Sequence, residues 1–569
     1  MCGIAGMFGK PDINVVHRMN RYQVHRGPDG QDAWCDDNVA LGHTRLAIVD
    51  RVGGDQPLFG PQGEVLIANG EIYNHALLRQ KNTTYVWNTN VDSEAILALH
   101  TQAKQRSKNN KISPLEHAKW VAQLDGMYAF SLWDPQAGQL ILARDPLGIK
   151  PMVRTVIDGS LLFASEAKAL RAHEGHTPAF DELALVARLA WEYPLDGTTL
   201  LKDVHHIRPG TVEVWSLEKA EPTLVGVADV ERQRLAPDTA WDPATQSETL
   251  LESFVESVSQ RLMGEVPMGI VLSGGLDSAL VAAVAHEAAE RAGQPVPACW
   301  TVAESEDNPD WIAAEKVAST LDLEHHQHIL EPDAFDRKLP DLTWHGEDFD
   351  VTVLFFQPLF ERMAEKVTVG LCGQGADELH GGYPRYRDLK AHGALIDARL
   401  AAMDHPAARQ MEQGDLPIGD SFYTNEHTGS AHTGSLESFL NFELEHGQLS
   451  NFQLRLVDRH SMAHSLEVRV PFLGQAHRQA SNTLPMDWRL PQTLEEKAAL
   501  RAAADLTTLP EDIVRRPKLP AGRATSPTLI NTLIEELKPR GDAVLHLSLI
   551  HISEPTRRYA ISYAVFCLK

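Results

Sequence analysis

The chain has 569 residues, of which 43% are hydrophobic and 23% are charged, and its net charge at pH 7 is −25. That length predicts two or more domains with apolar cores, and the acidic balance argues against a nucleic-acid-binding surface. No apolar run reaches the roughly 18 residues of a membrane-spanning helix, and the N-terminus lacks the layout of a signal peptide. Five cysteines without a Cys-x-x-Cys pair predict reduced thiols and a cytoplasmic protein.

The first informative stretch is Met1-Cys2-Gly3-Ile4-Ala5-Gly6. Removal of Met1 would leave Cys2 as the N-terminal residue. Its own α-amino group, with an ordinary pKa of about 8, could then act as the base for its thiol. The apolar run over residues 4–8 predicts a strand with Cys2 at its end. Cys2 is therefore a candidate nucleophile, although a second-position cysteine can also be incidental.

The next strands carry polar residues suited to an amino-acid substrate. The pattern over 42–50 predicts a strand with Arg45 near its start, and an arginine fork can hold a carboxylate bidentately. Asn69 and Gly70 follow a strand predicted over 65–68, and an amide beside a glycine N–H can form an oxyanion hole. Asp92 stands where the cap of a helix would be. Residues 127–133 and 139–143 predict a hairpin.

The middle of the chain gives weaker signals. We expect a strand over 161–166, a helix over 181–191 and a strand over 211–215. The polar stretch near 228–245 suggests a linker into a second domain.

The segment Ser273-Gly274-Gly275-Leu276-Asp277-Ser278 lies between an apolar run, 266–272, and an alanine-rich run, 279–292. This order predicts a strand, a glycine turn and a helix whose N-terminus can bind an anion. The loop lacks the Gly-Lys-Ser/Thr ending of a Walker A motif. We interpret it as a phosphate site; the alternative is a turn that needs glycine for geometry alone.

The second domain repeats strand and helix. Strands are predicted over 297–302, 323–330 and 366–371, with a helix over 310–320. Such alternation predicts a parallel sheet with ligands at the strand C-termini. The second glycine loop, 372–378, should therefore meet the first at one crevice. The histidines at 325, 326 and 328 fit a strand better than a metal site.

Taken together, these segments resemble known families. Cys2-Gly3-Ile4, HRGPDG at 25–30, HTRLAIVD at 43–50, NGEIYN at 69–74, DSE at 92–94 and RDPLGIKP at 144–151 resemble the class II glutamine amidotransferase domain. SGGLDS at 273–278, CGQGADELHGGY at 372–383 and SLEVRVPFL at 465–473 extend the resemblance to glutamine-hydrolysing asparagine synthetases. The motifs occur in the family's order from residue 1 to about 525.

The resemblance implies a two-domain fold of the α/β and α+β classes. The N-terminal domain would be an Ntn-hydrolase αββα sandwich, and the C-terminal domain a doubly wound parallel-sheet ATP pyrophosphatase. We expect a glutaminase domain at 1–215, a linker at 216–240 and a synthetase domain at 241–545. Residues 546–569 match nothing in the family and suggest either a cloning artefact or a variable tail.

The resemblance also assigns roles to residues. Cys2 would attack glutamine and form a thioester, with Asn69 and Gly70 as the oxyanion hole. Lys518 would stabilise the acyl-adenylate transition state. Glu378 is included as a catalytic residue because its carboxylate could compensate for the neutral Gln374. The expected glutamine-binding residues are Arg45, Leu46, Ala47, Ile48, Val49, Asn69, Gly70, Glu71 and Asp92. The expected ATP-binding residues are Val271, Leu272, Ser273, Gly274, Gly275, Asp277, Ser278, Val302, Cys372, Gly373 and Gln374. Asp277 and Asp377 would hold Mg²⁺.

The implied reaction joins two half-reactions. Glutamine is hydrolysed, ammonia passes internally, and a carboxylate activated by ATP is converted to an amide, with aspartate as the expected acceptor. The resemblance also suggests a homodimer. Cys372, Gln374, Gly474 and the segment after Lys518 depart from the family pattern on the acceptor side. Another carboxylate therefore stays open as the acceptor, as does a glutaminase with a regulatory nucleotide module. A ring-closing synthetase of the β-lactam type fits poorly because Cys2 is retained.

Overall fold

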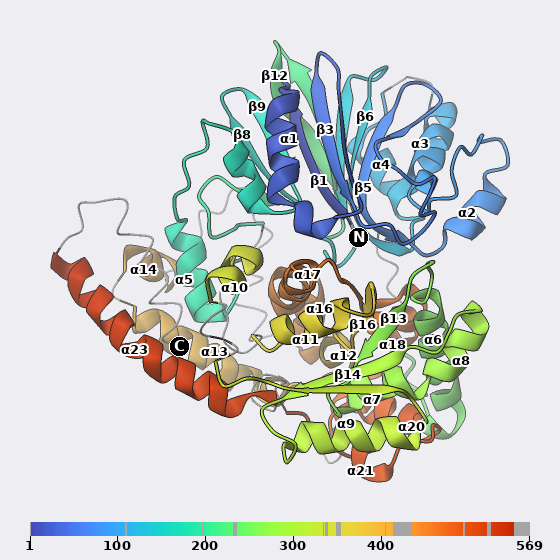
Figure 1. Cartoon of the computed structure of the whole chain (residues 1–569), viewed down its shortest axis with the longest axis vertical. Helices are drawn as coiled ribbons and strands as arrows, with labels where there is room; N and C mark the ends of the chain where they lie inside the picture. The colour runs from blue at the N-terminus through green and yellow to red at the C-terminus, as the bar shows by residue number, and fades with distance from the viewer. Residues whose placement is uncertain are drawn as a thin grey trace.

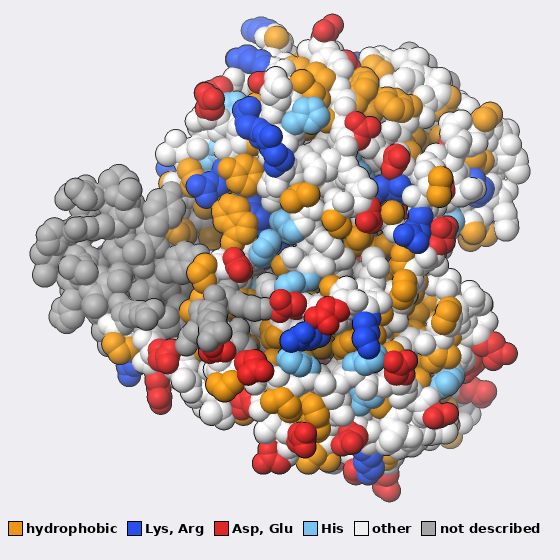
Figure 2. Space-filling view, in the orientation of Figure 1, with side chains coloured by type: hydrophobic (Ala, Val, Ile, Leu, Met, Phe, Trp, Pro, Cys, Tyr) orange, Lys and Arg blue, Asp and Glu red, His pale blue; other side chains and the backbone are white. Residues whose placement is uncertain are grey.

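The computed structural model describes residues 2–550 except 108–110, 196, 232–235, 334, 336–338, 349–353, 404, 413–434, 493–494 and 520–524. Figure 1 shows two domains stacked on one another, with the N-terminus at their junction. On the face in Figure 2, acidic and basic side chains are interspersed over both domains. Among the described residues, no helix combines the length and apolarity needed to cross a membrane.

The N-terminal domain contains two six-stranded antiparallel sheets. The first has the order β10-β8-β9-β1-β3-β2 and the second β12-β11-β7-β6-β5-β4. The strands of the first sheet are β1 (Cys2–Phe8), β2 (Gly30–Cys35), β3 (Val39–Arg45), β8 (Val153–Ile157), β9 (Ser160–Ala164) and β10 (His205–His206). Those of the second are β4 (Leu58–Phe59), β5 (Val65–Ile72), β6 (Gly126–Asp134), β7 (Gln139–Arg144), β11 (Thr211–Glu218) and β12 (Glu221–Asp229).

The two sheets pack face to face. Alternate apolar residues of each strand meet between them, where the rings of Phe8 and Trp133 lie 5.6 Å apart. The outer face of the first sheet packs on α1 (Ile13–Tyr22). The outer face of the second packs on α3 (Glu94–Arg106) and α4 (Pro114–Val121). This confirms the expected αββα sandwich, since each sheet has one face for its partner and one for helices.

Three local expectations in this domain differ from the structure. β3 ends at Arg45, because residues 46–49 leave the sheet and Leu46 and Ile48 pack on Val369 and Met462 of the other domain. β5 continues through Asn69 to Ile72. Asp92 does not cap α3: its carboxylate accepts a hydrogen bond from Ile72 N at 2.5 Å instead.

The expected linker at 216–240 also differs in part. Residues 211–229 form β11 and β12, which pair with one another at the edge of the second sheet. The N-terminal sheet therefore continues beyond residue 215. We place the start of the linker after Asp229.

The C-terminal domain is built on a five-stranded parallel sheet in the order β15-β14-β13-β16-β17. Its strands are β13 (Met268–Val271), β14 (Ala298–Ala303), β15 (His325–Ile329), β16 (Val369–Leu371) and β17 (Glu467–Arg469). Ile270 faces a cluster formed with α6 (Pro243–Gln260), α7 (Leu276–Ala283), α8 (Ala285–Ala292) and α9 (Pro309–Thr320). Its neighbour Val271 faces α11 (Phe356–Ala364) and α17 (Leu454–Met462). Helices thus cover both faces, as expected of a doubly wound sheet.

The alanine-rich run forms two helices. α7 ends at Ala283 and α8 begins at Ala285, because Val284 has φ −98° and ψ 3°. Within the described ranges, the other α-helices are α2 (His75–Lys81), α5 (Glu182–Trp191), α10 (Leu339–Gly346), α12 (Ala376–His380), α13 (Leu389–Ala401), α14 (Pro406–Glu412), α16 (Leu436–Glu445), α18 (Gln475–Asn482), α19 (Met486–Arg489), α20 (Ala498–Ala504), α21 (Glu511–Val514) and α23 (Pro527–Ile550). Residues 551–569, most of the atypical tail, lie outside the described residues.

Buried charges and apolar residues join the domains. Arg26 is fully buried and its Nη2 lies 2.9 Å from Asp458 of α17. Arg188 Nε lies 3.2 Å from Asp348. Met127 and Leu147 of the N-terminal domain share one apolar cluster with Leu379 of α12. The junction is therefore continuous packed interior, and elements from both domains can contribute to one site.

Candidate active site

Cys2 lies at the start of β1 and is buried, with 8% of its surface exposed. Burial raises the pKa of its thiol, and the nearby charge of Glu467 adds to the rise, whereas a hydrogen bond from the Leu46 backbone opposes it. The thiol faces the domain junction, where Glu467 belongs to β17 of the other domain. A buried thiol of this kind needs a base to become a nucleophile.

Asn69 and Gly70 lie beside Cys2. Asn69 is fully buried, and its Oδ1 accepts a hydrogen bond from Cys2 N at 3.0 Å. Its Nδ2 has no hydrogen-bond partner among the described residues. Gly70 has φ +145°, and a Cβ there would lie 1.9 Å from Met127 O, so no other residue fits. An unused amide donor beside a thiol is what stabilisation of a tetrahedral oxyanion requires.

Glu71 and Asp92 form a buried pair of carboxylates in the N-terminal domain. Burial raises the pKa of Glu71 well above its ordinary value, and the neighbouring Asp92 adds to this. Burial also raises the pKa of Asp92 to about 6, although the hydrogen bond from Ile72 N opposes the rise. Glu71 Oε2 has no partner among the described residues. Two carboxylates brought together in this way are stabilised by a cationic group between them.

Arg45 is the residue that pairs with Cys2 where β3 lies beside β1. Its Nη1 lies 2.7 Å from Asp55 Oδ1, and its Nη2 donates to Asp50 O at 2.6 Å. These bonds hold the guanidinium against the loop that carries Leu46, Ala47, Ile48 and Val49. Ala47 N donates to Asp29 Oδ2 at 2.8 Å and Glu265 N donates to Ile48 O at 2.9 Å, so both domains fix that loop. The structure thus places Arg45, Leu46 and Asn69 next to Cys2.

The second site lies at the C-terminal ends of β13 and β16. Gly274 has φ +67° and packs against α9, where a Cβ would lie 2.6 Å from the Ala313 side chain. Ser278 Oγ accepts from Ser273 N at 3.1 Å, which closes the turn. Ser273, Gly275, Asp277 and Ser278 line a cavity of about 60 Å³ together with Lys518. This is the expected anion site at a helix N-terminus.

The second glycine loop borders the first. A Cβ on Gly373 would lie 3.0 Å from Ser278 N, so the two loops touch. Cys372 is buried, and burial raises the pKa of its thiol to about 11, which makes it a poor nucleophile. Val271 and Val302 lie in the apolar cluster beneath, and Leu272 N donates to Trp300 O at 2.9 Å. The predicted ATP-binding residues are therefore neighbours in space.

Two aspartates and two lysines converge between these loops. Lys497 Nζ lies 2.5 Å from Asp277 and 2.6 Å from Asp377, and Lys518 Nζ lies 3.3 Å from Asp277 and 2.7 Å from Asp377. Burial opposes ionisation of Asp377, but the two lysines outweigh it and lower its pKa far below the ordinary value. Because both carboxylates reach one ammonium group, they could equally hold one divalent cation. The site therefore fits Mg²⁺ at Asp277 and Asp377.

Gln374 and Glu378 lie beside this cluster on the side of Tyr383. Gln374 Nε2 donates to Gln453 Oε1 at 2.6 Å, and Gln453 Nε2 donates to Tyr383 Oη at 2.8 Å. Glu378 is fully buried, and neither of its carboxylate oxygens has a hydrogen-bond partner among the described residues. Burial, with the charge of Asp377, raises the pKa of Glu378 to about 8. It is thus a carboxyl that can exchange a proton near neutral pH.

A single short strand, β17, touches both sites. The backbone carbonyl of Arg469 accepts from Cys372 N at 2.9 Å, while its guanidinium lies 2.6 Å from Glu467 and 3.6 Å from Glu71. Glu467 and Arg469 are fully buried. The strand therefore supports the second glycine loop with its backbone and the carboxylate pocket of Cys2 with its side chains.

Sequence reasoning missed Lys497, Gln453, Glu467 and Arg469 as members of these sites. Glu467 and Arg469 stand within the SLEVRVPFL segment, so that motif carried a signal. Lys497 directly precedes α20 in an ordinary charged sequence, and Gln453 lies in a polar stretch. Neither residue belongs to a motif that would have marked it as part of a site. These contacts are formed by residues far apart in the sequence. Lys497 and Asp277 are separated by 220 residues, and Gln453 and Gln374 by 79 residues.

The structure explains one departure from the family pattern. A Cβ on Gly474 would lie 2.0 Å from Ser257 Oγ and 2.8 Å from Arg261 Nη1. The space for a side chain at 474 is therefore already filled. The segment at 520–524, another departure, lies outside the described residues.

Glu64, His100 and Asp134 are close enough to one another to suggest a metal site. The Lys104 ammonium lies among them, 3.0 Å from Glu64 and 2.9 Å from Asp134. A buried lysine already supplies the positive charge there. We interpret this cluster as a structural ion pair.

The chain can now be compared with known proteins. A family model described as a glutamine amidotransferase domain matches residues 1–224, and one described as asparagine synthase matches residues 249–545. Asparagine synthetase [glutamine-hydrolyzing] 1 of Bacillus subtilis is 27% identical over 91% of this chain and 86% of its own length. The mouse enzyme is 29% identical over 91% and 83%. Asparagine synthetase B of Escherichia coli is 31% identical over 72% and 70%.

A class II amidotransferase domain joined to an ATP-using synthetase domain defines a glutamine-dependent ligase. The chain belongs to the asparagine synthase family.

Proposed function

We propose that this protein hydrolyses glutamine at Cys2 and uses the ammonia to convert an ATP-activated carboxylate into an amide, with release of AMP and pyrophosphate. The observation that carries the proposal is the pair of sites in one chain: a buried thiol beside an unused amide donor, and a phosphate-type loop beside two converging aspartates.

At the first site, the Cys2 thiolate attacks the side-chain amide carbon of glutamine. Asn69 Nδ2 and Gly70 N donate to the oxygen that becomes negative, and collapse of this intermediate releases ammonia and leaves a glutamyl thioester for water to cleave. Glu71 and Asp92 attract the substrate α-ammonium, and Arg45 holds the α-carboxylate. The α-amino group of Cys2, once Met1 is removed, takes the thiol proton.

At the second site, Ser273 to Ser278 and Gly373 hold the phosphates of ATP, and Val271, Leu272 and Val302 contact the nucleoside. Asp277 and Asp377 would hold Mg²⁺, which would offset the negative charge of the phosphates when bound. Lys518 places its charge where the acceptor carboxylate attacks the α-phosphate. Glu378, with its pKa near 8, takes a proton from the attacking ammonia.

Ammonia passes between the sites through the apolar junction around Met127, Leu147 and Leu379. An apolar route favours neutral ammonia, because burial of ammonium without a counter-charge is costly. The nucleophile therefore arrives unprotonated.

Aspartate is the acceptor we favour, since the named relatives are asparagine synthetases. The competing candidate is another carboxylate, because the neutral Gln374 and its bond to Gln453 replace a charged group beside the acceptor. We further propose a cytoplasmic homodimer, with the glutaminase domain ending near Asp229 and the synthetase domain spanning about 241–545.

The test of the two-site scheme is Cys2→Ala. Amide formation from glutamine should stop, and formation from added ammonia should continue at its wild-type rate. Loss of both would refute the scheme. Release of pyrophosphate with a panel of carboxylates, aspartate first, then identifies the acceptor; no release with any of them would leave only a glutaminase.

A further inference from the structure

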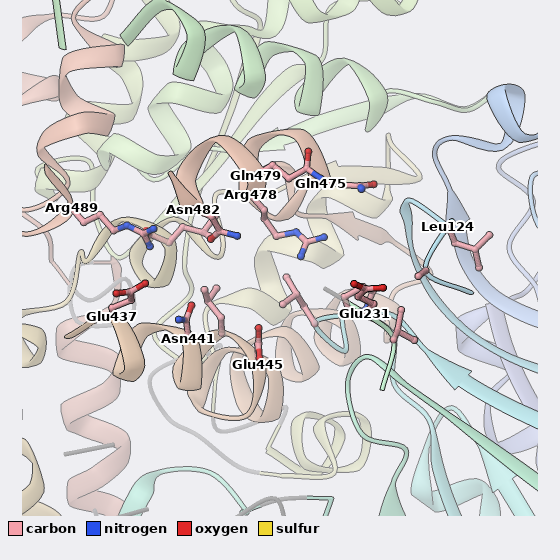
Figure 3. Close-up of a pocket in the computed structure, with 16 residues that line it drawn as sticks. Leu124, Glu231, Glu437, Asn441, Glu445, Gln475, Arg478, Gln479, Asn482 and Arg489 are labelled. Atoms are coloured by element: carbon pink, nitrogen blue, oxygen red, sulfur yellow. The ribbon is translucent and has the colours of Figure 1, made fainter. Parts of the chain in front are cut away.

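A cavity of about 100 Å³ lies at the junction of the two domains, and none of its lining residues belongs to either active site. α16 and α18 form two of its walls. Leu124 of the N-terminal domain and Glu231 of the segment after β12 lie at its far end (Figure 3), and Leu147 also lines it. Its volume is well below the roughly 300 Å³ of the smallest drug-sized pockets, which favours a ligand of amino-acid size over a nucleotide.

Four side-chain amides line the cavity, together with two arginines (Arg478 and Arg489), three glutamates (Glu231, Glu437 and Glu445) and seven apolar residues. Gln475, Gln479 and Asn482 lie on one face of α18, because their spacing of four and three residues follows the helical repeat. Asn441 of α16 lies across the cavity from Asn482 (Figure 3). A helix face at a domain junction is ordinarily apolar. Amides offer both donors and acceptors, so this face suits a ligand that carries an amide of its own.

Arg489 supplies a buried positive charge at one end of the cavity. It is 4% exposed, and it donates to Leu484 O at 3.3 Å, Leu379 O at 3.0 Å and Ser481 O at 2.7 Å. No described carboxylate lies within 4.0 Å of it, and three bonds leave two of its five N–H groups for a ligand. Burial lowers the pKa of Arg489 to about 10. A buried cation without an ion pair is stabilised by an incoming carboxylate.

Carboxylates stand at the rim. Glu437, near Arg489 in Figure 3, and Glu231, at the opposite end, are both exposed. They offer an attractive position for an ammonium group. The cavity thus presents partners for a carboxylate, an ammonium and an amide within one small volume.

We propose that this cavity binds a free α-amino acid with a side-chain amide, the chemical class to which the substrate glutamine and an amide product belong. The choice of asparagine as the probe rests on the proposed function. The cavity lies outside both active sites, and two of its lining residues, Leu147 and Leu379, also belong to the apolar junction proposed for ammonia. A ligand here would contact both domains and would lie beside Leu379, the residue after Glu378.

Equilibrium dialysis of radiolabelled asparagine against the full-length Cys2→Ala protein tests the proposal. Saturating aspartate is present so that the acceptor site is occupied. Asn441→Ala and Glu437→Gln, which alter side chains at the cavity without removing core packing, should each raise the dissociation constant at least tenfold. Glu315→Gln, an exposed glutamate of α9, is the matched control and should leave it unchanged. Acetate and propylamine, which each carry one charge of the ligand, should not compete.

The same two substitutions in the Cys2 enzyme should leave pyrophosphate release and glutamine hydrolysis unchanged, so failure here is distinguishable from failure of the proposed function. Equal asparagine affinity in all variants would overturn the proposal. The proposal would also be overturned if aspartate displaced all of the bound asparagine, or if acetate competed as well as unlabelled asparagine does.

Discussion

At the scale of single residues, the buried pair Glu71 and Asp92 is the part of the proposed glutamine site that attracts the substrate α-ammonium group. The pKa of Asp92 is raised to about 6, and that of Glu71 is raised well above its ordinary value, in both cases mainly by burial. Below these values the carboxyls are protonated and lose their attraction for an α-ammonium group. Their shifted pKa values therefore predict an acid limit to glutamine binding rather than to the chemistry of the thiol.

We expect kcat/KM for glutamine to fall as the pH is lowered through the region around 6. The acid limb of the pH profile should correspond to the uptake of two protons, one by Glu71 and one by Asp92. Asp92→Asn removes one carboxyl, so its limb should reflect one proton, and kcat/KM at pH 8 should drop by about tenfold or more. A pH profile of glutaminase activity measures both. An unchanged two-proton limb in the variant would show that other groups set it.

Lys497 is the second residue that matters at this scale, because it bridges Asp277 and Asp377 at 2.5 and 2.6 Å. When phosphates and a cation occupy the site, its charge is placed to stabilise the developing negative charge there. The sequence offered no motif for it.

Lys497→Met should lower ammonia-dependent pyrophosphate release by roughly 100- to 1000-fold, the usual effect of removing one such electrostatic partner. Glutaminase activity at Cys2 in the same preparation serves as the control for folding and should change less than threefold. Equal loss of both activities would indicate a structural role instead.

At the scale of elements, β17 links the two sites. Its Arg469 carbonyl anchors Cys372 of the second glycine loop, and its guanidinium faces Glu71. A movement of the second glycine loop can affect the glutamine site through β17 only if the side chains of β17 contribute to glutamine binding.

Arg469→Met should raise the KM for glutamine, because Glu71 and Glu467 would be left without their shared counter-charge, and should alter the KM for ammonia little. Val468→Ala on the same strand is the control and should affect stability only. Steady-state kinetics with both nitrogen donors separates the cases; an equal effect on both donors would place Arg469 outside glutamine binding.

At the scale of the whole molecule, a buried junction holds the domains together. Arg26 donates to Glu166 at 2.9 Å and pairs with Asp458 at 2.9 Å, and all three are buried. Removing one member of such a set leaves an uncompensated charge.

Asp458→Asn should destabilise the junction by about 3–5 kcal/mol, seen as a lower denaturant midpoint for separation of the domains. Amide formation from glutamine should fall more than formation from added ammonia, because only the former needs the sites to be joined. A proportional fall of both would show that the junction does not support ammonia transfer.

The sequence by itself indicated several strands and helices of each domain, the parallel sheet of the second domain, and Cys2, Arg45, Asn69 and Asp277 as candidate site residues. These predictions follow from local periodicity and from glycine turns, whereas the αββα class and the role of Asp377 were implied by the resemblance to the family. The predicted linker and the end of β3 were less accurate, because sheet edges and domain contacts, not local pattern, decide where those elements stop.

Only the tertiary structure decided which distant residues complete the sites. Lys497 meets Asp277, Gln453 meets Gln374 and Arg469 meets Glu71 because separate elements converge after the domains fold and dock. The same holds for the amide-lined cavity, whose walls come from α16 and α18 and whose closure comes from the other domain. Local sequence fixes which face a residue takes on its own element; the partner across that face is set by packing and burial, which the sequence pattern does not encode.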